Sequence, residues 1–491
     1  MKMWSGRFRE PLDPDFEDWQ RSFVFDWQLL PQETAASQAH AFALAAAGIL
    51  SAAELKQIVD ALVAIREENA GLTDLAARSE AEDIHHFVEL ELVARIGELG
   101  LKLHTGRSRN EQIATDLRLY VREKSAAIIA LLASWSKELL KQARTSDGAA
   151  MPAYTHLQRA EPVLVAHWLQ AYVEMLLRDM ARLRDLSARL NYCPLGSGAV
   201  AGATLKLDRT IAAEELGFTA PTANSMDATS DRDFALEFLQ ALSVAALHAS
   251  RFAEEITLYA TAEFGFIRLP ERFSTGSSAM PQKKNPDLTE LVRAKVGRIH
   301  GAAQSVTMVL KGLPLAYNKD LQETQEPIFS AADSAERMFR LLGMFTAALE
   351  FNFDRMRAAC ETGYLNAMAA ATYLVHKGLP FRKAHERVGQ AVRYGLETER
   401  ELGDLTLEEL RRFAPEFDTD FFSSITLEAT LNCHDVVGGT AIARVHEALA
   451  EQEKRIASLS GAPLSEKTEQ EDLGEQVHTG LIQTGQIHGN S

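Results

Sequence analysis

Residues 274–286, STGSSAMPQKKNP, form a small-residue, hydroxyl-rich stretch that ends in two lysines. Asn285 and Pro286 are typical of a helix N-cap and first helical position, so we expect a helix from 287 to about 311. Glu290 then falls in its first turn, where a carboxylate suits the positive end of the helix dipole. The stretch predicts a loop at which an anion can bind and lose a proton. Chemistry alone also allows an ordinary surface loop, since Gly-Ser-Ser and Lys-Lys are common there.

Long helical patterns on both sides of this loop indicate an all-α protein. Apolar residues keep helical spacing over about 110–143, from Pro162 to about 191, over 230–264, and after Pro327 toward 351. A helix of ~30 residues is about 45 Å long, so these segments predict an elongated bundle. Alternating strand patterns between helices are not found, and a doubly wound sheet is therefore not expected.

Shorter helices are predicted nearer the N-terminus. Ser51 and Glu54 have the spacing of a capping box, and an apolar stripe follows them. A second candidate helix covers residues 75–95. At the other end, residues 461–491 are polar and glycine-rich, which is typical of a disordered tail.

The composition is that of a soluble globular protein, with 46% hydrophobic and 24% charged residues among 491. The formal net charge of −17 argues against nucleic-acid binding, because a polyphosphate backbone would be repelled. A local cluster of lysines could still bind an anionic substrate.

The cysteines and the N-terminus point to the cytoplasm. Cys193, Cys360 and Cys433 are far apart and share no CxxC spacing, so neither a disulfide framework nor a thiolate metal site is expected. The first ten residues lack an apolar core, and no long uncharged apolar run occurs, so we expect no signal peptide and no membrane span.

The pattern G-S-S-x-M-P-x-K-x-N-P in residues 276–286 is similar to the signature of the fumarase/aspartase superfamily, and QKKNPD (282–287) resembles its argininosuccinate lyase branch. The resemblance covers roughly residues 3–458. It implies a helical N-terminal domain (1–108), a central domain of long helices (109–358) and a C-terminal domain (359–458), followed by a disordered tail (459–491). It also implies a homotetramer whose long helices form one core, with each active site collected from three subunits.

The reaction implied by the resemblance is the cleavage of argininosuccinate to arginine and fumarate in arginine biosynthesis, by anti elimination without a cofactor. Ser277 would be the base, acting as an alkoxide stabilised by N–H groups and Lys283. Lys283 and Asn285 would hold the carboxylate whose charge grows in the transition state. His156, paired with Glu290, would assist proton delivery to the departing nitrogen, directly or through water.

Further matching segments imply the substrate contacts. These segments are LHTGRSRNEQ (103–112), YTHLQ (154–158), NSMDATSDRDF (224–234) and LPLAYNKDLQE (313–323). An arginine fork suits a carboxylate because it can bind both oxygens. The implied substrate ligands are Ser108, Arg109, Asn110, Thr155, Arg232, Tyr317 and Gln322.

Two positions depart from the family pattern. Glu111 stands where the family usually has Asp, and Gln325 stands where it often has a lysine that helps bind substrate. In the EDIHH segment (82–86), Asp83, His85 and His86 could suggest a metal site, but the spacing supplies no third ligand and no metal is expected. The glycines of residues 196–202 lack the spacing and the preceding strand of a dinucleotide loop.

Three alternatives remain open at this stage. One is another fumarate-releasing lyase, acting on adenylosuccinate or aspartate. A second is a structural homologue without activity, as in the lens delta-crystallins, which the departure at Gln325 keeps open. A third is a regulatory protein whose tail docks a partner.

Overall fold

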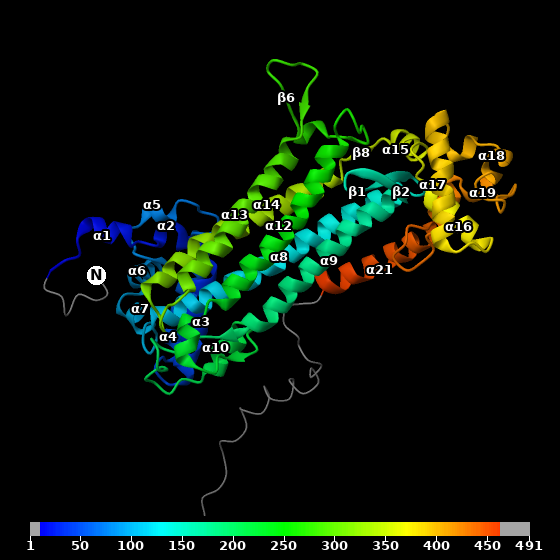
Figure 1. Ribbon diagram of the computed structural model, residues 1–491. Helices are drawn as coiled ribbons and strands as arrows, with labels where there is room; N and C mark the ends of the chain where they lie inside the picture. The colour runs from blue at the N-terminus through cyan, green and yellow to red at the C-terminus, as the bar shows by residue number, and fades with distance from the viewer. Residues whose placement is uncertain (1–9, 462–491) are drawn as a thin grey trace, which may run out of the picture.

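A computed structural model describes residues 10–461, and its centre is a bundle of long helices (Figure 1). The helix α8 packs against α9 and α14, and α12 packs against α13. The mostly helical fold predicted from sequence is confirmed. The bundle helices are α8 (Arg109–Thr145), α9 (Val165–Leu190), α12 (Asp233–Tyr259), α13 (Asp287–Leu310) and α14 (Gln325–Thr346).

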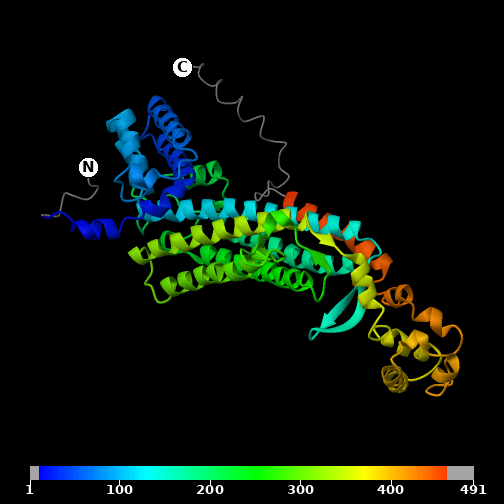
Figure 2. The ribbon, with the colours of Figure 1, turned by 90° about the horizontal axis from the view of Figure 1, so that it is seen from above.

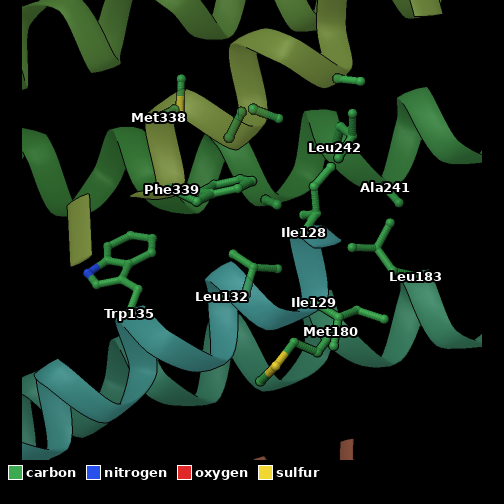
Figure 3. Packing of buried hydrophobic residues seen from close by; sticks show 14 of the residues in the cluster. Ile128, Ile129, Leu132, Trp135, Met180, Leu183, Ala241, Leu242, Met338 and Phe339 are labelled. Atoms are coloured by element: carbon green, nitrogen blue, oxygen red, sulfur yellow. The ribbon is translucent and has the colours of Figure 1, made fainter. Parts of the chain in front are cut away.

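The bundle is held together by interlocking apolar side chains, shown from close by in Figure 3. Trp135 of α8 is fully buried, stacks on Phe339 of α14 at 6.3 Å between ring centroids, and meets Phe252 of α12 edge-on at 5.4 Å. Its Nε1 donates a hydrogen bond of 2.9 Å to Thr346 Oγ1. One side chain thus joins three helices.

Replacing Trp135 by alanine is expected to lower the free energy of unfolding by about 3–5 kcal/mol, because a large cavity forms and the Thr346 hydroxyl loses its partner. Urea unfolding at fixed protein concentration measures this change. The exposed Lys137 on the same helix provides a control, and Lys137→Ala should change stability by less than about 0.5 kcal/mol. Equal midpoints for the two variants would contradict the packing described above.

Small helices gather at one end of the bundle (Figure 2). The Ser51–Glu54 capping box is present and confirms the predicted start of α4. These helices are α1 (Pro14–Trp19), α2 (Phe23–Asp26), η1 (Trp27–Leu29), α3 (Leu30–Ala46), α4 (Ala52–Glu68), α5 (Leu75–Arg78), α6 (Ile84–Ile96), α7 (Glu98–Lys102), α10 (Arg209–Glu215) and α11 (Ser225–Ser230).

A second group of helices lies at the opposite end and has a hydrophobic core of its own (Figure 2). Phe417 and Phe421 meet edge-on at 4.7 Å inside it. The group and its neighbours are α15 (Phe353–Cys360), α16 (Ala367–His376), α17 (Phe381–Thr398), η4 (Leu402–Asp404), α18 (Leu407–Arg411), α19 (Phe421–Ser424) and α20 (Leu427–Asn432).

The last described helix, α21 (Ile442–Gly461), returns to the bundle. Gln452 Nε2 donates to Gln170 O at 3.2 Å, and Gln170 Nε2 donates to Val445 O at 2.9 Å, which ties α21 to α9. Residues 462–491 of the predicted tail lie outside the described residues. The three predicted domain boundaries stay predictions.

Strands are few and short. The paired strands are β1 (Ala150–Thr155) with β2 (Gln158–Leu164), β3 (Tyr192–Cys193) with β4 (Ala220–Pro221), β5 (Ile267–Arg268) with β8 (Glu350–Phe351), and β6 (Thr275–Gly276) with β7 (Lys284–Asn285). Only the β3–β4 pair is parallel among the pairs of residues 10–461. Two short 3₁₀ helices, η2 (Glu271–Phe273) and η3 (Lys319–Thr324), complete the described chain.

The prediction that Pro162 begins a helix is wrong. Pro162 lies in β2 opposite Pro152 of β1, and α9 begins only at Val165. A proline disfavours the helical conformation in the residue before it, so both segments become extended and pair as a hairpin.

Three other predicted helix boundaries need correction. The 75–95 helix is interrupted after Arg78, because Arg21 draws the carbonyl groups of Ala76 and Ala81 into hydrogen bonds of 2.8 Å. The 230–264 helix begins at Asp233, since the extended Asp231 accepts a hydrogen bond from Asp233 N instead.

The third correction concerns the start of α13. Pro286 is its N-cap, and Asn285 lies one residue earlier, in β7.

The three cysteines are free thiols, as expected. Within residues 10–461, none of the helices combines the length and the hydropathy that a membrane span requires.

Candidate active site

A cavity of about 130 Å³ lies where α8 begins, between the small N-terminal helices and the bundle. Four of the predicted substrate ligands line it: Arg109, Asn110, Tyr317 and Gln322. Gln325, the departure noted in the sequence, lines it too. The complete lining is Ser22, Asp26, Glu82, Asp83, His85, Arg109, Asn110, Ile113, Tyr317, Lys319, Gln322 and Gln325.

The N-terminus of α8 is fixed by a capping box. Ser108 Oγ accepts a hydrogen bond from Asn110 N at 3.3 Å, and Glu111 Oε1 accepts from Ser108 N at 3.0 Å. The other oxygen of Glu111 accepts from Gly198 N at 2.9 Å. Glu111 therefore ties the glycine-rich loop at 196–202 to the helix that carries Asn110. Ser108 faces a neighbouring hollow formed with this loop.

Arg109 is held by acidic residues. Its Nη1 is 2.7 Å from Asp83 Oδ2 and 3.3 Å from Glu82 Oε2. Lys319 Nζ lies 3.5 Å from Glu82 Oε1. Arg109 and Lys319, two cations that line the cavity, are thus paired with carboxylates.

Arg232 is placed behind the cavity. It is 1% exposed, caps α12, and its Nη1 donates to Asp231 O at 2.7 Å. Burial lowers the pKa of Arg232 to about 10, and the guanidinium lies close enough to Tyr317 for their charges to interact. Gln322 is held by a 3.0 Å hydrogen bond from its Nε2 to Gln20 O.

Sequence reasoning missed Ser22 and Asp26 of the cavity wall. Ser22 Oγ donates to Asp26 Oδ2 at 2.6 Å, and Ile84 N donates to Asp26 Oδ1 at 3.1 Å. Burial, reinforced by the charge of Asp83, raises the pKa of Asp26 to about 7. The available signal was a hydroxyl and a carboxylate one helical turn apart in the apolar run SFVFD.

Thr155 and His156 lie at the tip of the β1–β2 hairpin. Thr155 forms the last strand pair with Gln158, so His156 and Leu157 make a two-residue turn. Both have positive φ, 54° and 58°, as such turns require. The tip is exposed, and Leu157 is 72% exposed.

Ser277 lies in a loop that projects from the bundle between β6 and β7 (Figure 1). Its Oγ accepts hydrogen bonds from Ala279 N at 3.2 Å and from Met280 N at 3.1 Å. Two such donors would stabilise a negative charge on this oxygen. Lys283 is exposed in the same loop, and Asn285 Nδ2 donates to Thr275 Oγ1 at 3.3 Å.

The predicted residues form two groups at opposite ends of the bundle. The 24 residues of α13 separate the Ser277 loop, before its start, from Tyr317, beyond its end, and a helix of that length spans about 36 Å. The hairpin likewise follows the far end of α8 (Figure 1). In the described chain Glu290 pairs with Arg293 at 3.8 Å, and no hydrogen bond or ion pair joins it to His156.

Comparisons with known proteins give a consistent result. A family model described as "Lyase" matches residues 6–301, and one described as "Argininosuccinate lyase C-terminal" matches residues 364–432. The chain is 67% identical to argininosuccinate lyase of Acidobacterium capsulatum, over 94% of this chain and 96% of that protein. It is 55% identical to argininosuccinate lyase of Koribacter versatilis, over 94% and 98% of the two chains.

Solved structures share the fold. An EDDS lyase in complex with formate superposes with a TM-score of 0.78 at 24% identity, covering 92% of each chain. The class II fumarase of Schistosoma mansoni gives 0.70 at 16% identity, over 87% of this chain and 93% of that one.

Proposed function

Because the chain belongs to the argininosuccinate lyases, we propose that it cleaves argininosuccinate to L-arginine and fumarate at active sites completed by several copies of the chain. The proposal that several copies complete each active site rests on the distance between the cavity and the Ser277 loop. About 36 Å of helix separates them in one chain, so one protomer alone cannot apply Ser277 to a substrate held in its own cavity.

The cavity takes the arginine half of the substrate. Glu82 and Asp83 in its wall, each already paired with Arg109 or Lys319, can also accept hydrogen bonds from a guanidino or amino group. Hydrogen bonds come from two separate segments: Asn110 at the start of α8, and Tyr317 and Gln322 in the stretch after α13. The succinyl half then extends toward the loop and the hairpin of neighbouring copies.

Ser277 removes the proton from the carbon next to the carboxylate that Lys283 and Asn285 hold. The electron pair is delocalised into that carboxylate, and the two N–H groups on Ser277 Oγ favour its alkoxide form before the transfer. The carbanion-like intermediate then expels the guanidino nitrogen, which leaves fumarate. The departing nitrogen takes a proton at the side opposite to Ser277, which makes the elimination anti. No step needs a cofactor or a metal.

His156 acts on the departing nitrogen, oriented by Glu290 of a different copy, and Thr155 binds substrate beside it. The exposed hairpin tip supports this arrangement, because its left-handed turn presents the imidazole to solvent rather than to its own chain. Glu290 is exposed as well, 3.8 Å from Arg293 of its own chain, so a second copy can reach it.

We assign a homotetramer located in the cytoplasm. Exposed apolar side chains on the bundle support assembly: Leu247 on α12, and Leu291 and Met308 on α13, are 52%, 55% and 62% exposed. Analytical ultracentrifugation should give four times the chain mass of 54.2 kDa. A monomer that is fully active at every concentration would contradict both the assembly and the shared site.

A substrate panel tests the reaction. Purified protein is mixed with argininosuccinate, adenylosuccinate or aspartate, and fumarate is followed by its ultraviolet absorbance. Fumarate should form from argininosuccinate alone. Fumarate from one of the others would indicate a different lyase of the superfamily, and a folded protein inert toward all three would indicate a structural homologue.

Gln325 is expected to contribute to substrate binding without a charge. It is 4% exposed and lines the cavity, and its Oε1 accepts no hydrogen bond from the described chain. Gln325→Leu should raise KM about tenfold, or ~1.4 kcal/mol, and leave kcat within about twofold, because binding is lost equally in the ground and transition states. Steady-state kinetics measure both constants. Gln304→Leu, a change at an exposed position, is the matched control. An unchanged KM in Gln325→Leu would show that Gln325 does not bind the substrate.

A further inference from the structure

A buried cluster of Glu33, His85 and Asp116 borders the cavity. The three residues come from α3, α6 and α8 and are 0%, 7% and 0% exposed. His85 Nδ1 is 2.7 Å from Glu33 Oε2 and 3.8 Å from Asp116 Oδ2. Since His85 also lines the cavity, the protonation of this cluster determines the charge that the cavity wall presents to a ligand.

Glu33 is well supplied with hydrogen-bond donors. Besides His85, Gln112 Nε2 donates to Glu33 Oε1 at 3.1 Å and Ser37 Oγ donates to it at 2.8 Å. Arg107 Nη1 donates to the Ser37 oxygen at 2.8 Å. Burial would raise the pKa of Glu33, but the charge of His85 and its hydrogen bond outweigh that effect and hold the pKa below its ordinary value.

Asp116 has the opposite surroundings. Neither of its side-chain oxygens accepts a hydrogen bond from any N–H or hydroxyl group of residues 10–461. Its charged neighbours are the carboxyl groups of Glu33 and Asp26, the guanidinium of Arg107, and His85, whose Nδ1 is 3.8 Å away. Burial and the two carboxyl groups outweigh the effect of Arg107 and raise the pKa of Asp116 well above its ordinary value. Two adjacent buried carboxyl groups in this situation share one proton.

A divalent metal could occupy a group of this composition, since one histidine and two carboxylates lie within 4.8 Å of one another. The distances favour a proton. Two ligands of a tetrahedral zinc ion, each ~2.0–2.1 Å from the metal, lie about 3.3 Å apart, whereas His85 Nδ1 and Glu33 Oε2 are 2.7 Å apart, a direct hydrogen bond.

We propose that Asp116 is a positioning residue that shares one proton with Glu33, and that this pair, with its single negative charge, holds His85 as a cation in the wall of the substrate cavity. The proposal rests on the proposed function, because that function supplies the substrate carboxylate that His85 would bind. The cation would face the carboxylate of the arginine half and supply the positive charge that Gln325 does not.

The charged groups around His85 fit this assignment. Glu33 and Asp83 raise the pKa of His85, which burial and Arg109 lower, and the net pKa lies above the ordinary value. Loss of the shared proton at high pH would place a second negative charge beside His85. The cavity would then bind an anionic group less well.

Infrared spectroscopy tests the shared proton without relying on activity. At pH 8 the wild-type protein should show the C=O stretch of a buried protonated carboxyl group, and Asp116→Asn should remove it. Asp333→Asn, a change on the exposed face of α14, should leave the band in place. The proposal would be overturned if the wild type lacked this band or if the band survived in Asp116→Asn. It would also be overturned if the wild type bound one equivalent of metal and Asp116→Asn bound none.

Kinetics test the consequence for the cavity. Asparagine mimics the protonated acid, so Asp116→Asn should keep kcat and KM within about threefold of wild type at pH 7. Above pH 8, where the shared proton is lost, KM of the wild type should rise at least fivefold more than KM of the variant, because only the wild type gains a second negative charge beside His85; loss of the proton of His85 itself is common to both proteins. Parallel KM profiles would overturn the positioning role. If argininosuccinate gives no fumarate, the proposed function fails. The infrared band still shows whether Asp116 and Glu33 share a proton.

Discussion

A mixture of two inactive variants, His156→Asn and Ser277→Ala, is expected to recover about a quarter of wild-type activity after the subunits are exchanged. Each site takes its hairpin from one copy and its serine loop from another. With equal random mixing, half of the hairpins and half of the loops are intact, and one half times one half is a quarter. Exchange by mild denaturation and renaturation, followed by the fumarate assay, measures the recovery.

The control for this experiment places both defects in one loop. Ser277→Ala and Lys283→Ala chains can also be mixed, but no mixed tetramer then contains an intact loop, so activity should stay at the level of the parents. If the His156→Asn and Ser277→Ala mixture also stays at that level, although mass spectrometry shows mixed tetramers, the sites are not shared between copies.

Ser277→Ala alone is expected to lower kcat by about 10²–10⁴-fold, the usual contribution of a proton-transferring group. Substrate binding should persist, because the cavity residues lie far from this loop and hold the other half of the substrate. The variant should also fold normally, since within residues 10–461 Ser277 Oγ accepts hydrogen bonds from just two loop N–H groups, which water can satisfy.

Single-turnover kinetics and calorimetric titration separate the two effects of this variant. The neighbouring Ser278→Ala is the control, as it removes a hydroxyl from the same exposed loop and should leave kcat within a few fold. A Ser277→Ala enzyme with more than a tenth of wild-type turnover would show that another group takes the proton.

Local sequence patterns predicted the long helices well, because apolar spacing and caps act within a few residues. The errors arose where a distant group decided the outcome. Arg21 interrupts the 75–95 segment from more than fifty residues away, and Pro152 pairs with Pro162 across a hairpin. Neither effect can be read from the residues next to the break.

The predicted substrate ligands that the structure brings together come from two separate motifs, and their role stays a prediction. Arg109 and Asn110 lie more than two hundred residues from Tyr317 and Gln322 in sequence, and all four line one cavity. The place of Asp26 in the cavity wall was not predicted, because it depends on Ile84 N, which the fold alone brings near. The pairing of His156 with Glu290 stays a prediction, since the two do not meet within one chain.

A crystal structure of Ser277→Ala with uncleaved argininosuccinate would test the shared site most directly. The arginine half should lie in the cavity of one copy, against Tyr317 and Gln322. The succinyl half should lie within hydrogen-bonding distance of the 274–286 loop of a second copy and of the His156 hairpin of a third. A substrate bound entirely by residues of one copy would contradict the proposed active site.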